Sequence, residues 1–338
     1  MTVRVAINGF GRIGRLVLRS IVEFARRDIE VVTINDLGPV ETNAHLLRYD
    51  SVHGRFPGHV DVEGDTIDVG LGKIKVTAIR DPAQLPHKDL GVDIALECTG
   101  LFTSRAKAKA HLEAGAKRVL VSAPCDDADR TVVFGVNHQA LTKDDLVVSN
   151  GSCTTNCLAP VAKVLNDTVG IETGFMTTIH AYTGDQPTLD TLHKDLHRAR
   201  AAAVSIIPTS TGAARAIGLV IPELKGKLDG SSMRVPTPNV SVVDLKIVPG
   251  RDVTRDEINE ALIKASEDGP LKGVLAVTRD PLVSVDLNHI AASATVALEQ
   301  TQVIEGKLAR VMAWYDNEWG FSTRMADIAL EMAKLDQA

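Results

Sequence analysis

Aromatic residues, cysteines and long apolar runs are all scarce in this chain of 338 residues, in which 4% of residues are aromatic and four are cysteine. No stretch approaches the roughly 18 consecutive apolar residues of a membrane-spanning helix, so we expect no membrane partner. Four cysteines do not make a secreted disulfide scaffold, and their spacing leaves a zinc site incomplete. The first residues also lack the regions of an export signal. We therefore expect a cytoplasmic protein without a bound metal.

Basic residues are not concentrated in any one part of the chain. The formal net charge is −6, and no block rich in lysine and arginine with interleaved aromatics is present. This excludes the electrostatic pattern of a nucleic-acid binder, so we expect no nucleic-acid partner. A hydrophobic content of 44% and a charged content of 24% are ordinary for a globular protein, and the length suggests about two domains.

The first 150 residues alternate short apolar runs with amphipathic segments. Strands are expected at 3–7, 31–34, 92–96 and 118–121, and helices at 12–24 and 105–114. This alternation predicts an α/β unit with a Rossmann-type parallel sheet covered by helices on both faces. Longer β-rich stretches follow at 174–181, 240–248, 293–298 and 308–314. They predict a mainly antiparallel sheet in a second, α+β domain, and the apolar stripe of 319–335 predicts a closing helix.

A glycine pattern, G-x-G-x-x-G, directly follows the first expected strand and opens the first expected helix. Gly9 would allow a tight turn, Gly11 would let the backbone approach a pyrophosphate, and Gly14 would permit close packing of helix on strand. The N–H groups of Arg12 and Ile13 would then hold the pyrophosphate. A glycine-rich turn without a ligand is the alternative.

Asp36 follows the next expected strand, 22 residues beyond Gly14, where a ribose-binding carboxylate is expected. A carboxylate there accepts hydrogen bonds from both ribose hydroxyls and repels a 2′-phosphate, and no arginine follows it directly. The sequence therefore favours NAD over NADP. Thr99 and Ser122 follow two further strands and would also face the cofactor, although each hydroxyl is equally suited to capping a turn.

Cys153 stands where the apolar stretch 146–149 gives way to the helix-like run 158–165. At a helix N-terminus, unpaired N–H groups and the positive end of the dipole favour an anion, which would lower the thiol pKa and make Cys153 a nucleophile. Burial as a small apolar residue is the alternative for Cys153 and our expectation for Cys157, one helical turn later.

His180 shares one face of an expected strand with Thr178 and Tyr182. The ordinary pKa of histidine lies near working pH, so His180 would pair with Cys153 and act as a general base. A structural role is the alternative, because a lone histidine on a strand more often has one. The sequence does not establish that the two side chains meet.

Basic residues in neutral surroundings provide candidate phosphate sites. Arg198 and Arg200 precede three alanines, Arg234 opens a proline- and threonine-rich segment, and residues 209–214 resemble a helix start rich in hydroxyl groups. Arginine forks, hydroxyls and helix-start N–H groups together bind phosphate. Solvated surface arginines are the alternative.

In combination these motifs resemble one family, the phosphorylating glyceraldehyde-3-phosphate dehydrogenases of the glycolytic type. The matching segments, in family order, are 7–15, 35–36, 152–160, His180, 234–241 and 314–318. They span nearly the whole chain, and such a set is far more specific than one motif. The resemblance implies a Rossmann NAD-binding domain over 1–152, completed by a C-terminal helix over 319–336, a catalytic domain over 153–318, and a homotetramer.

The resemblance also implies a reaction: NAD-dependent oxidation of D-glyceraldehyde 3-phosphate with inorganic phosphate to 1,3-bisphosphoglycerate, through a thiohemiacetal and an acyl-thioester on Cys153, with His180 as the base. The implied cofactor residues are Gly9, Gly11, Arg12, Ile13, Gly14, Asp36, Thr99, Ser122 and Asn317, the last of which would hold the nicotinamide carboxamide. Thr183 and Arg234 would bind the substrate phosphate. The attacking phosphate would be surrounded by Ser152, Thr154, Arg198, Thr211 and Gly212.

Two other functions remain open. An enzyme acting on erythrose 4-phosphate, in which thioester hydrolysis replaces phosphorolysis, resembles this chain at 282–286 and 316–321, whereas residues 35–36 and the intact segment 209–214 favour the triose enzyme. A non-catalytic NAD-binding regulatory protein predicts loss of the nucleophile or the base, and both are present. Residues 191–192 depart from the Leu-Pro pair frequent in NAD-specific members, which leaves the use of NADP open.

Overall fold

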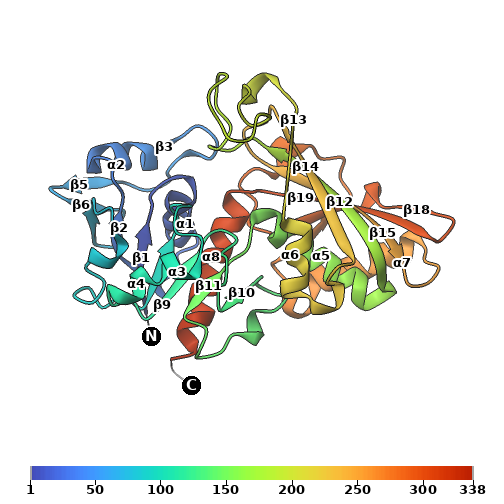
Figure 1. The fold of residues 1–338 in the computed structure, drawn as a ribbon, viewed down its shortest axis with the longest axis horizontal. Helices are drawn as coiled ribbons and strands as arrows, with labels where there is room; N and C mark the ends of the chain where they lie inside the picture. Colours follow the sequence, from blue (N-terminus) through green and yellow to red (C-terminus); the bar gives the residue numbers. More distant parts are fainter. Residues whose placement is uncertain (1, 337–338) are drawn as a thin grey trace. The chain divides into compact units, whose positions relative to one another are not determined.

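The computed structural model describes residues 2–336, which fold into two compact units, drawn in Figure 1. Unit 1 comprises 2–134, 138–152 and 321–336, and unit 2 comprises 135–137 and 153–320. The α/β fold class expected from the sequence is confirmed, with a mostly parallel sheet in the first unit and a mainly antiparallel one in the second. None of the helices within 2–336 combines the length and apolar character needed to cross a membrane.

Unit 1 is built on a nine-stranded sheet with the order β10-β11-β9-β8-β1-β2-β7-β6-β5. Its strands are β1 Val3–Asn8, β2 Ile29–Asn35, β5 Asp61–Glu63, β6 Thr66–Asp68, β7 Lys73–Thr77, β8 Ile94–Glu97, β9 Arg118–Val121, β10 Arg130–Thr131 and β11 Val147–Ser149. All pairs from β10 to β7 are parallel, and β6 and β5 add an antiparallel edge. The central strands are nearly continuous apolar runs, as expected where both faces of a parallel sheet are covered.

The helices of unit 1 include α1 Arg12–Glu23, α2 Val40–Arg48, α3 Arg105–Ala108 and α4 Ala110–Glu113. The stretch 105–114, expected as one helix, forms the two short helices α3 and α4, which meet at Lys109. The closing helix is α8, Trp319–Lys334, and its apolar stripe is buried as expected. A small hairpin pairs β3 Tyr49–Asp50 with β4 Gly54–Arg55.

Unit 2 is built on an eight-stranded sheet with the order β13-β14-β12-β15-β19-β17-β16, and β18 pairs with β19 beside this path. The strands are β12 Ile171–Ala181, β13 Ile207–Thr209, β14 Leu228–Val235, β15 Ser241–Pro249, β16 Leu275–Thr278, β17 Ala294–Ala297, β18 Gln302–Ile304 and β19 Leu308–Tyr315. The pairs β12–β14 and β16–β17 are parallel, and the others are antiparallel.

The helices of unit 2 are α5 Cys153–Val169, α6 Ala213–Val220 and α7 Arg255–Glu267, and α5 packs against both others and against β19. Short 3-10 helices across the chain are Pro82–Gln84, His138–Ala140, Ala202–Val204, Pro222–Leu224, Gly269–Leu271, Ser284–Leu287 and Leu298–Gln300. Strand β12 turns Met176, Thr178 and His180 to the buried side, whereas Phe175 is exposed. The alternation expected for this strand therefore directs His180 into the interior of unit 2.

Candidate functional site

Cys153 is the first residue of α5, and its Sγ lies 3.5 Å from Nε2 of His180 on β12. The turn before it contains Gly151, whose φ of +64° is readily adopted only by glycine. The structure thus brings together the thiol and the imidazole that the sequence singled out separately. Cys157, one turn further along α5, is fully buried and its thiol contacts the carbonyl of Ala313.

A third group, Arg234 on β14, completes this centre. Strands β12 and β14 pair in parallel, and His180 is the register partner of Arg234. Arg234 Nη1 donates to the carbonyl oxygen of Ala181 at 3.0 Å, and Nδ1 of His180 lies 2.7 Å from the same oxygen. When the Nδ1–H of His180 donates there, Nε2 keeps its lone pair and faces Cys153. That tautomer is the one a general base requires. Nη1 of Arg234 also lies 2.6 Å from Nδ1, and a hydrogen bond donated there would place the imidazole proton on Nε2 instead.

Burial controls the proton affinities of this centre. Burial first, and then the charge of Arg234, lowers the pKa of His180 to about 3, so the imidazole is neutral near pH 7. Burial raises the pKa of the Cys153 thiol, while the Arg234 charge and hydrogen bonds at Thr154 act in the opposite direction. The expectation of a lowered thiol pKa was therefore wrong, because desolvation of the thiol outweighs the helix N-terminus.

A buried hydroxyl cluster holds the start of α5. The hydroxyl of Tyr315 lies 2.8 Å from Oγ1 of Thr154 and 2.9 Å from Oγ1 of Thr178, which joins α5, β12 and β19. The Tyr315 ring also stands edge-on to His180, with centroids 5.9 Å apart. Sequence reasoning did not identify this role of Tyr315, although the residue lies within the matching segment 314–318.

Asn317 lies on the loop before α8 and is oriented by two neighbours. Its Oδ1 accepts a hydrogen bond from Ser241 Oγ at 2.7 Å, and Ser241 Oγ accepts from the backbone N–H of Ala181 at 3.0 Å. The buried carboxylate of Asp316 fixes the same loop by accepting from the backbone N–H groups of Glu318 and Trp319. Within residues 2–336 the amide nitrogen of Asn317 makes no hydrogen bond, so it is available to a ligand.

The candidate phosphate residues are only partly assembled. Arg198 forms an ion pair with Asp185. Burial is the main cause that lowers the pKa of Arg234, and the charge of Arg198 lowers it further, whereas Cys153 acts in the opposite direction. The two guanidinium groups are therefore close enough to interact electrostatically. Thr183 donates from its backbone N–H to the side chain of Gln186 at 2.9 Å.

The segment before α6 adds hydroxyl groups beside β14. Thr211 Oγ1 accepts from the Ala213 N–H at 3.2 Å, and Gly212 precedes α6 with open space at its Cα. Thr209, on β13, is buried, and within 2–336 its hydroxyl has no hydrogen-bond partner. A buried hydroxyl without a partner is suited to donate a hydrogen bond to a bound anion. Ser152 directly precedes Cys153, whereas Thr154 is already engaged by Tyr315.

The glycine turn of unit 1 has the geometry that a dinucleotide needs. Gly9 has a φ of +91°, and a Cβ there would lie 2.7 Å from the Thr99 backbone nitrogen. A Cβ on Gly14 would lie 2.1 Å from the Gly9 carbonyl oxygen, whereas Gly11 faces open space. No side chain caps the start of α1, so the N–H groups near Arg12 and Ile13 suit a pyrophosphate. The Arg12 side chain itself pairs with Asp50 at 2.6 Å.

Asp36 is held at the rim of a cavity of about 360 Å³ that also includes Gly9, Gly11, Thr99 and Arg80. Its two carboxylate oxygens accept from the backbone N–H groups of Phe10 and Gly38, each at 2.9 Å. No arginine directly follows Asp36 in the chain, but Arg80 lines the same cavity. Arg80 follows β7, which lies beside β2 in the sheet. Ser122 follows β9 and hydrogen-bonds Cys98 instead of lining this cavity.

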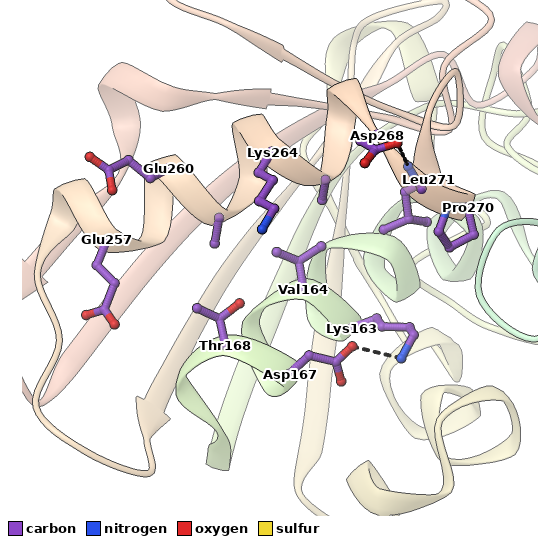
Figure 2. Close-up of a pocket in the computed structure, with 13 residues that line it drawn as sticks. Lys163, Val164, Asp167, Thr168, Glu257, Glu260, Lys264, Asp268, Pro270 and Leu271 are labelled. Carbon is purple, nitrogen blue, oxygen red and sulfur yellow. Dashed lines mark hydrogen bonds and ion pairs between the residues drawn. The ribbon is translucent and has the colours of Figure 1, made fainter.

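A larger cavity of about 600 Å³ lies between α5 and α7, and Figure 2 shows Lys163 and Asp167 of α5 and Lys264 of α7 among the residues that line it. Its lining on α5 begins at Lys163, about 15 Å along the helix from Cys153. No cysteine or histidine lines it. This cavity therefore takes no part in the chemistry of Cys153.

Comparison with known proteins identifies relatives over the full length. The family model of the glyceraldehyde 3-phosphate dehydrogenase NAD binding domain matches residues 3–105, and the model of the C-terminal domain matches 152–317. The protein named glyceraldehyde-3-phosphate dehydrogenase from Xanthobacter flavus is 73% identical over 335 residues, covering 99% of this chain and 100% of that protein. Proteins of the same name are 70% identical in Cereibacter sphaeroides, with the same coverage, and 55% identical in Geobacillus stearothermophilus, covering 98% and 99%.

Proposed function

The chain belongs to the glyceraldehyde 3-phosphate dehydrogenase family, and from this membership we propose how its residues carry out the reaction. It is an NAD-dependent oxidoreductase that acts on the aldehyde group of D-glyceraldehyde 3-phosphate, with inorganic phosphate as the second substrate and 1,3-bisphosphoglycerate as the product. The observation that carries the mechanism is the 3.5 Å approach of Cys153 Sγ to His180 Nε2.

The first step is attack of Cys153 on the aldehyde. The sulfur forms a bond to C1, the thiol proton passes to Nε2 of His180, and the carbonyl oxygen takes that proton to complete a thiohemiacetal. The imidazole is neutral near pH 7, because burial and the Arg234 charge lower its pKa to about 3, so Nε2 has a lone pair for this proton. The backbone N–H of Cys153 at the start of α5 stabilises the transient oxyanion.

The second step is oxidation, for which NAD supplies the hydride acceptor. His180 removes the hydroxyl proton of the thiohemiacetal through Nε2 as C1 loses hydride, which leaves an acyl-thioester on Cys153. An oxygen of inorganic phosphate then attacks the thioester carbon, the carbon–sulfur bond breaks, and Cys153 leaves as a thiolate. Water must be kept from the thioester at this stage, because hydrolysis would compete with attack by phosphate.

Substrate binding follows from the charges beside this centre. We assign Thr183 and Arg234 to the phosphate of the aldehyde. Ser152, Thr154, Arg198, Thr211 and Gly212 are assigned to the attacking phosphate, supported by the unpartnered hydroxyl of Thr209 on the same segment. Arg198 would exchange its carboxylate partner Asp185 for phosphate, a substitution of one oxyanion for another.

Cofactor binding is assigned to residues 1–152 with the helix over 319–336 as the NAD-binding domain, and the catalytic domain is assigned to 153–318. Gly9, Gly11, Arg12, Ile13, Gly14, Thr99 and Ser122 would hold the dinucleotide on unit 1. Asp36 would accept hydrogen bonds from the ribose hydroxyls, since each carboxylate oxygen retains a lone pair beyond its bond to Phe10 or Gly38. The free amide nitrogen of Asn317 would donate to the nicotinamide carboxamide.

We further propose a cytoplasmic homotetramer. Five large apolar side chains are 70% exposed or more on one segment of unit 2, namely Leu189, Leu192, Leu196, Val204 and Ile206. Apolar surface of this density is typical of a protein interface, and a second copy of this chain would cover it. All four cysteines are unpaired, which suits a reducing compartment.

The decisive assay follows NADH absorbance with glyceraldehyde 3-phosphate and NAD, with and without inorganic phosphate. We expect NADH formation that requires phosphate. A rate independent of phosphate would contradict the phosphorylating reaction, and higher kcat/KM with erythrose 4-phosphate would point to the sister activity. Sedimentation at several protein concentrations tests the tetramer separately.

A further inference from the structure

Four neighbouring strands of the unit 1 sheet end on polar residues that stand in register. Thr77, Asn35, Asn8 and Glu97 are the last residues of β7, β2, β1 and β8, and each is the register partner of the next. We call these four residues the strand-end row. Matched positions of parallel strands direct their side chains to the same face, so the row forms one continuous line of polar groups.

Hydrogen bonds run along the strand-end row without a break. Thr77 Oγ1 donates to Asn35 Oδ1 at 2.8 Å, and Asn35 Nδ2 donates to Asn8 Oδ1 at 2.7 Å. Asn8 Nδ2 then donates to Glu97 Oε2 at 2.6 Å. A carboxylate accepts only, so it obliges Asn8 to present its NH₂ group, which in turn obliges Asn35 to do the same. The orientation of the Asn8 amide is therefore set by Glu97. That of Asn35 is also fixed by the Ile79 backbone, whose carbonyl accepts from Nδ2 at 2.8 Å and whose N–H donates to Oδ1 at 2.9 Å.

The Glu97 end is anchored by groups that lie deep in unit 1. Glu97 is 1% exposed, and its Oε2 also pairs with Nε2 of His111 at 3.0 Å. Nδ1 of His111 lies 3.0 Å from Nε2 of His87, and both rings are almost fully buried. The other oxygen of Glu97 accepts from the backbone N–H of Thr99 at 2.8 Å and from its hydroxyl. His111 thus holds the carboxylate that holds Asn8 and Thr99.

Two members of the strand-end row, Asn8 and Asn35, line the cavity beside Asp36 together with Thr99. Thr77, Glu97 and His111 do not line it and reach it only through these residues. The backbone follows the same arrangement, because the carbonyl of Asn35 accepts from the N–H of Gly9 at 2.8 Å. A displacement of the row would therefore move the glycine turn as well as Asn8 and Asn35.

We propose that Glu97 and His111 are positioning residues for NAD, acting through Asn8 and Thr99 on the surface that receives the adenosine half of the cofactor. This inference rests on the proposed function, since it takes NAD as the ligand. Loss of the His111 donor leaves a buried carboxylate short of one partner, and the carboxylate regains hydrogen bonds only by drawing Asn8 or Thr99 out of place. NAD affinity then falls, while the chemistry on Cys153 does not change.

The first test compares His111→Leu with His111→Gln, because leucine removes the donor and glutamine retains an N–H for Glu97. We expect His111→Leu to raise the NAD dissociation constant, measured by calorimetric titration, about tenfold. His111→Gln should stay within about threefold of the original value. At saturating NAD the kcat and the KM for the aldehyde should remain within about twofold of the wild-type values, because both depend on the catalytic and substrate residues of unit 2. The proposal would be overturned if the NAD dissociation constant of His111→Leu did not change. It would also be overturned if kcat, the KM for NAD and the KM for the aldehyde all worsened by the same factor.

A second pair of variants covers the case in which His111→Leu does not fold. Thr77→Val removes the hydroxyl that donates to Asn35, a residue of the cavity lining. Thr33→Val removes a similar hydroxyl on the same strand pair, which donates at 3.0 Å to the carbonyl of Lys75, a residue outside the lining. We expect Thr77→Val to raise the NAD dissociation constant about threefold and Thr33→Val to leave it unchanged. Equal effects of both would overturn the proposal.

The wild-type protein separates this inference from the proposed function. If it neither binds NAD by titration nor forms NADH in a phosphate-dependent manner, the proposed function fails. If it does both, and the variant pairs show no difference in NAD affinity, only the positioning role fails.

Discussion

Nη1 of Arg234 lies 2.6 Å from Nδ1 of His180, because both groups converge on the carbonyl oxygen of Ala181. The convergence follows from the register of two parallel strands, which places Arg234 opposite His180. One permanent positive charge therefore stands behind the imidazole and within reach of the thiol. It favours the thiolate, as attack by Cys153 requires, and it disfavours the imidazolium, which opposes transfer of the thiol proton to His180.

The Arg234 charge predicts a shift in thiol reactivity. Arg234 lowers the pKa of Cys153 against the effect of burial, so Arg234→Gln should raise that pKa and move the pH profile of iodoacetamide alkylation to higher pH. Arg200→Gln is the matched control, because Arg200 is exposed and pairs with Asp190 on the surface. A profile that stays in place, or moves to lower pH, would contradict this account.

The approach of His180 Nε2 to the Cys153 thiol, at 3.5 Å, predicts the effect of removing the base. His180→Asn keeps a polar group but has no lone pair at the position of Nε2 that could accept a proton, so kcat should fall by about 10²- to 10⁴-fold. Calorimetric titration should give an unchanged NAD dissociation constant, since the cofactor residues assigned to unit 1 are untouched. Stopped-flow measurement of the first turnover gives the chemical rate directly. Full activity of His180→Asn would refute its role as base.

The hydroxyl cluster around Tyr315 predicts a loss of stability. Tyr315→Phe removes the group that satisfies Thr154 and Thr178, both buried, so the free energy of unfolding should fall by about 1–3 kcal/mol. Urea unfolding at a fixed protein concentration measures this change. Tyr49→Phe, at an exposed tyrosine of β3, makes the same chemical change and should cost less than about 0.5 kcal/mol. Equal losses in both variants would mean that the cluster contributes nothing.

Local signals in the sequence were sufficient for part of the structure. The glycine turn at 9–14 is recognisable from its own residues and the strand before it. The start of α5 at Cys153 is recognisable from the change from an apolar stretch to a helix-like pattern. Apolar runs short enough for strands alternated with amphipathic helices in unit 1, which predicted the parallel sheet. These features are local in the chain, and so is the physics that produces them.

The remaining features depend on strand order and register, which no local pattern reveals. The pairing of His180 with Arg234 joins residues 54 positions apart, and the bond from Thr154 to Tyr315 joins residues 161 positions apart. The sign of the Cys153 pKa shift was wrong because burial, a property of the folded unit, outweighs the helix start. Arg80 was missed beside Asp36 because only the residues next to Asp36 in the chain were considered.

Cofactor choice gives the last prediction. The Asp36 carboxylate would repel the 2′-phosphate of NADP, while Arg80, which lines the same cavity, would attract it once that carboxylate is gone. Asp36→Ala should therefore lower kcat/KM with NAD and raise it with NADP, changing their ratio by more than about tenfold. Adding Arg80→Ala should remove most of the gain with NADP. Asp81→Ala, at an exposed acid next to Arg80, is the matched control and should leave the ratio unchanged. A ratio that is the same in Asp36→Ala and in the wild type would show that Asp36 does not discriminate between the two cofactors.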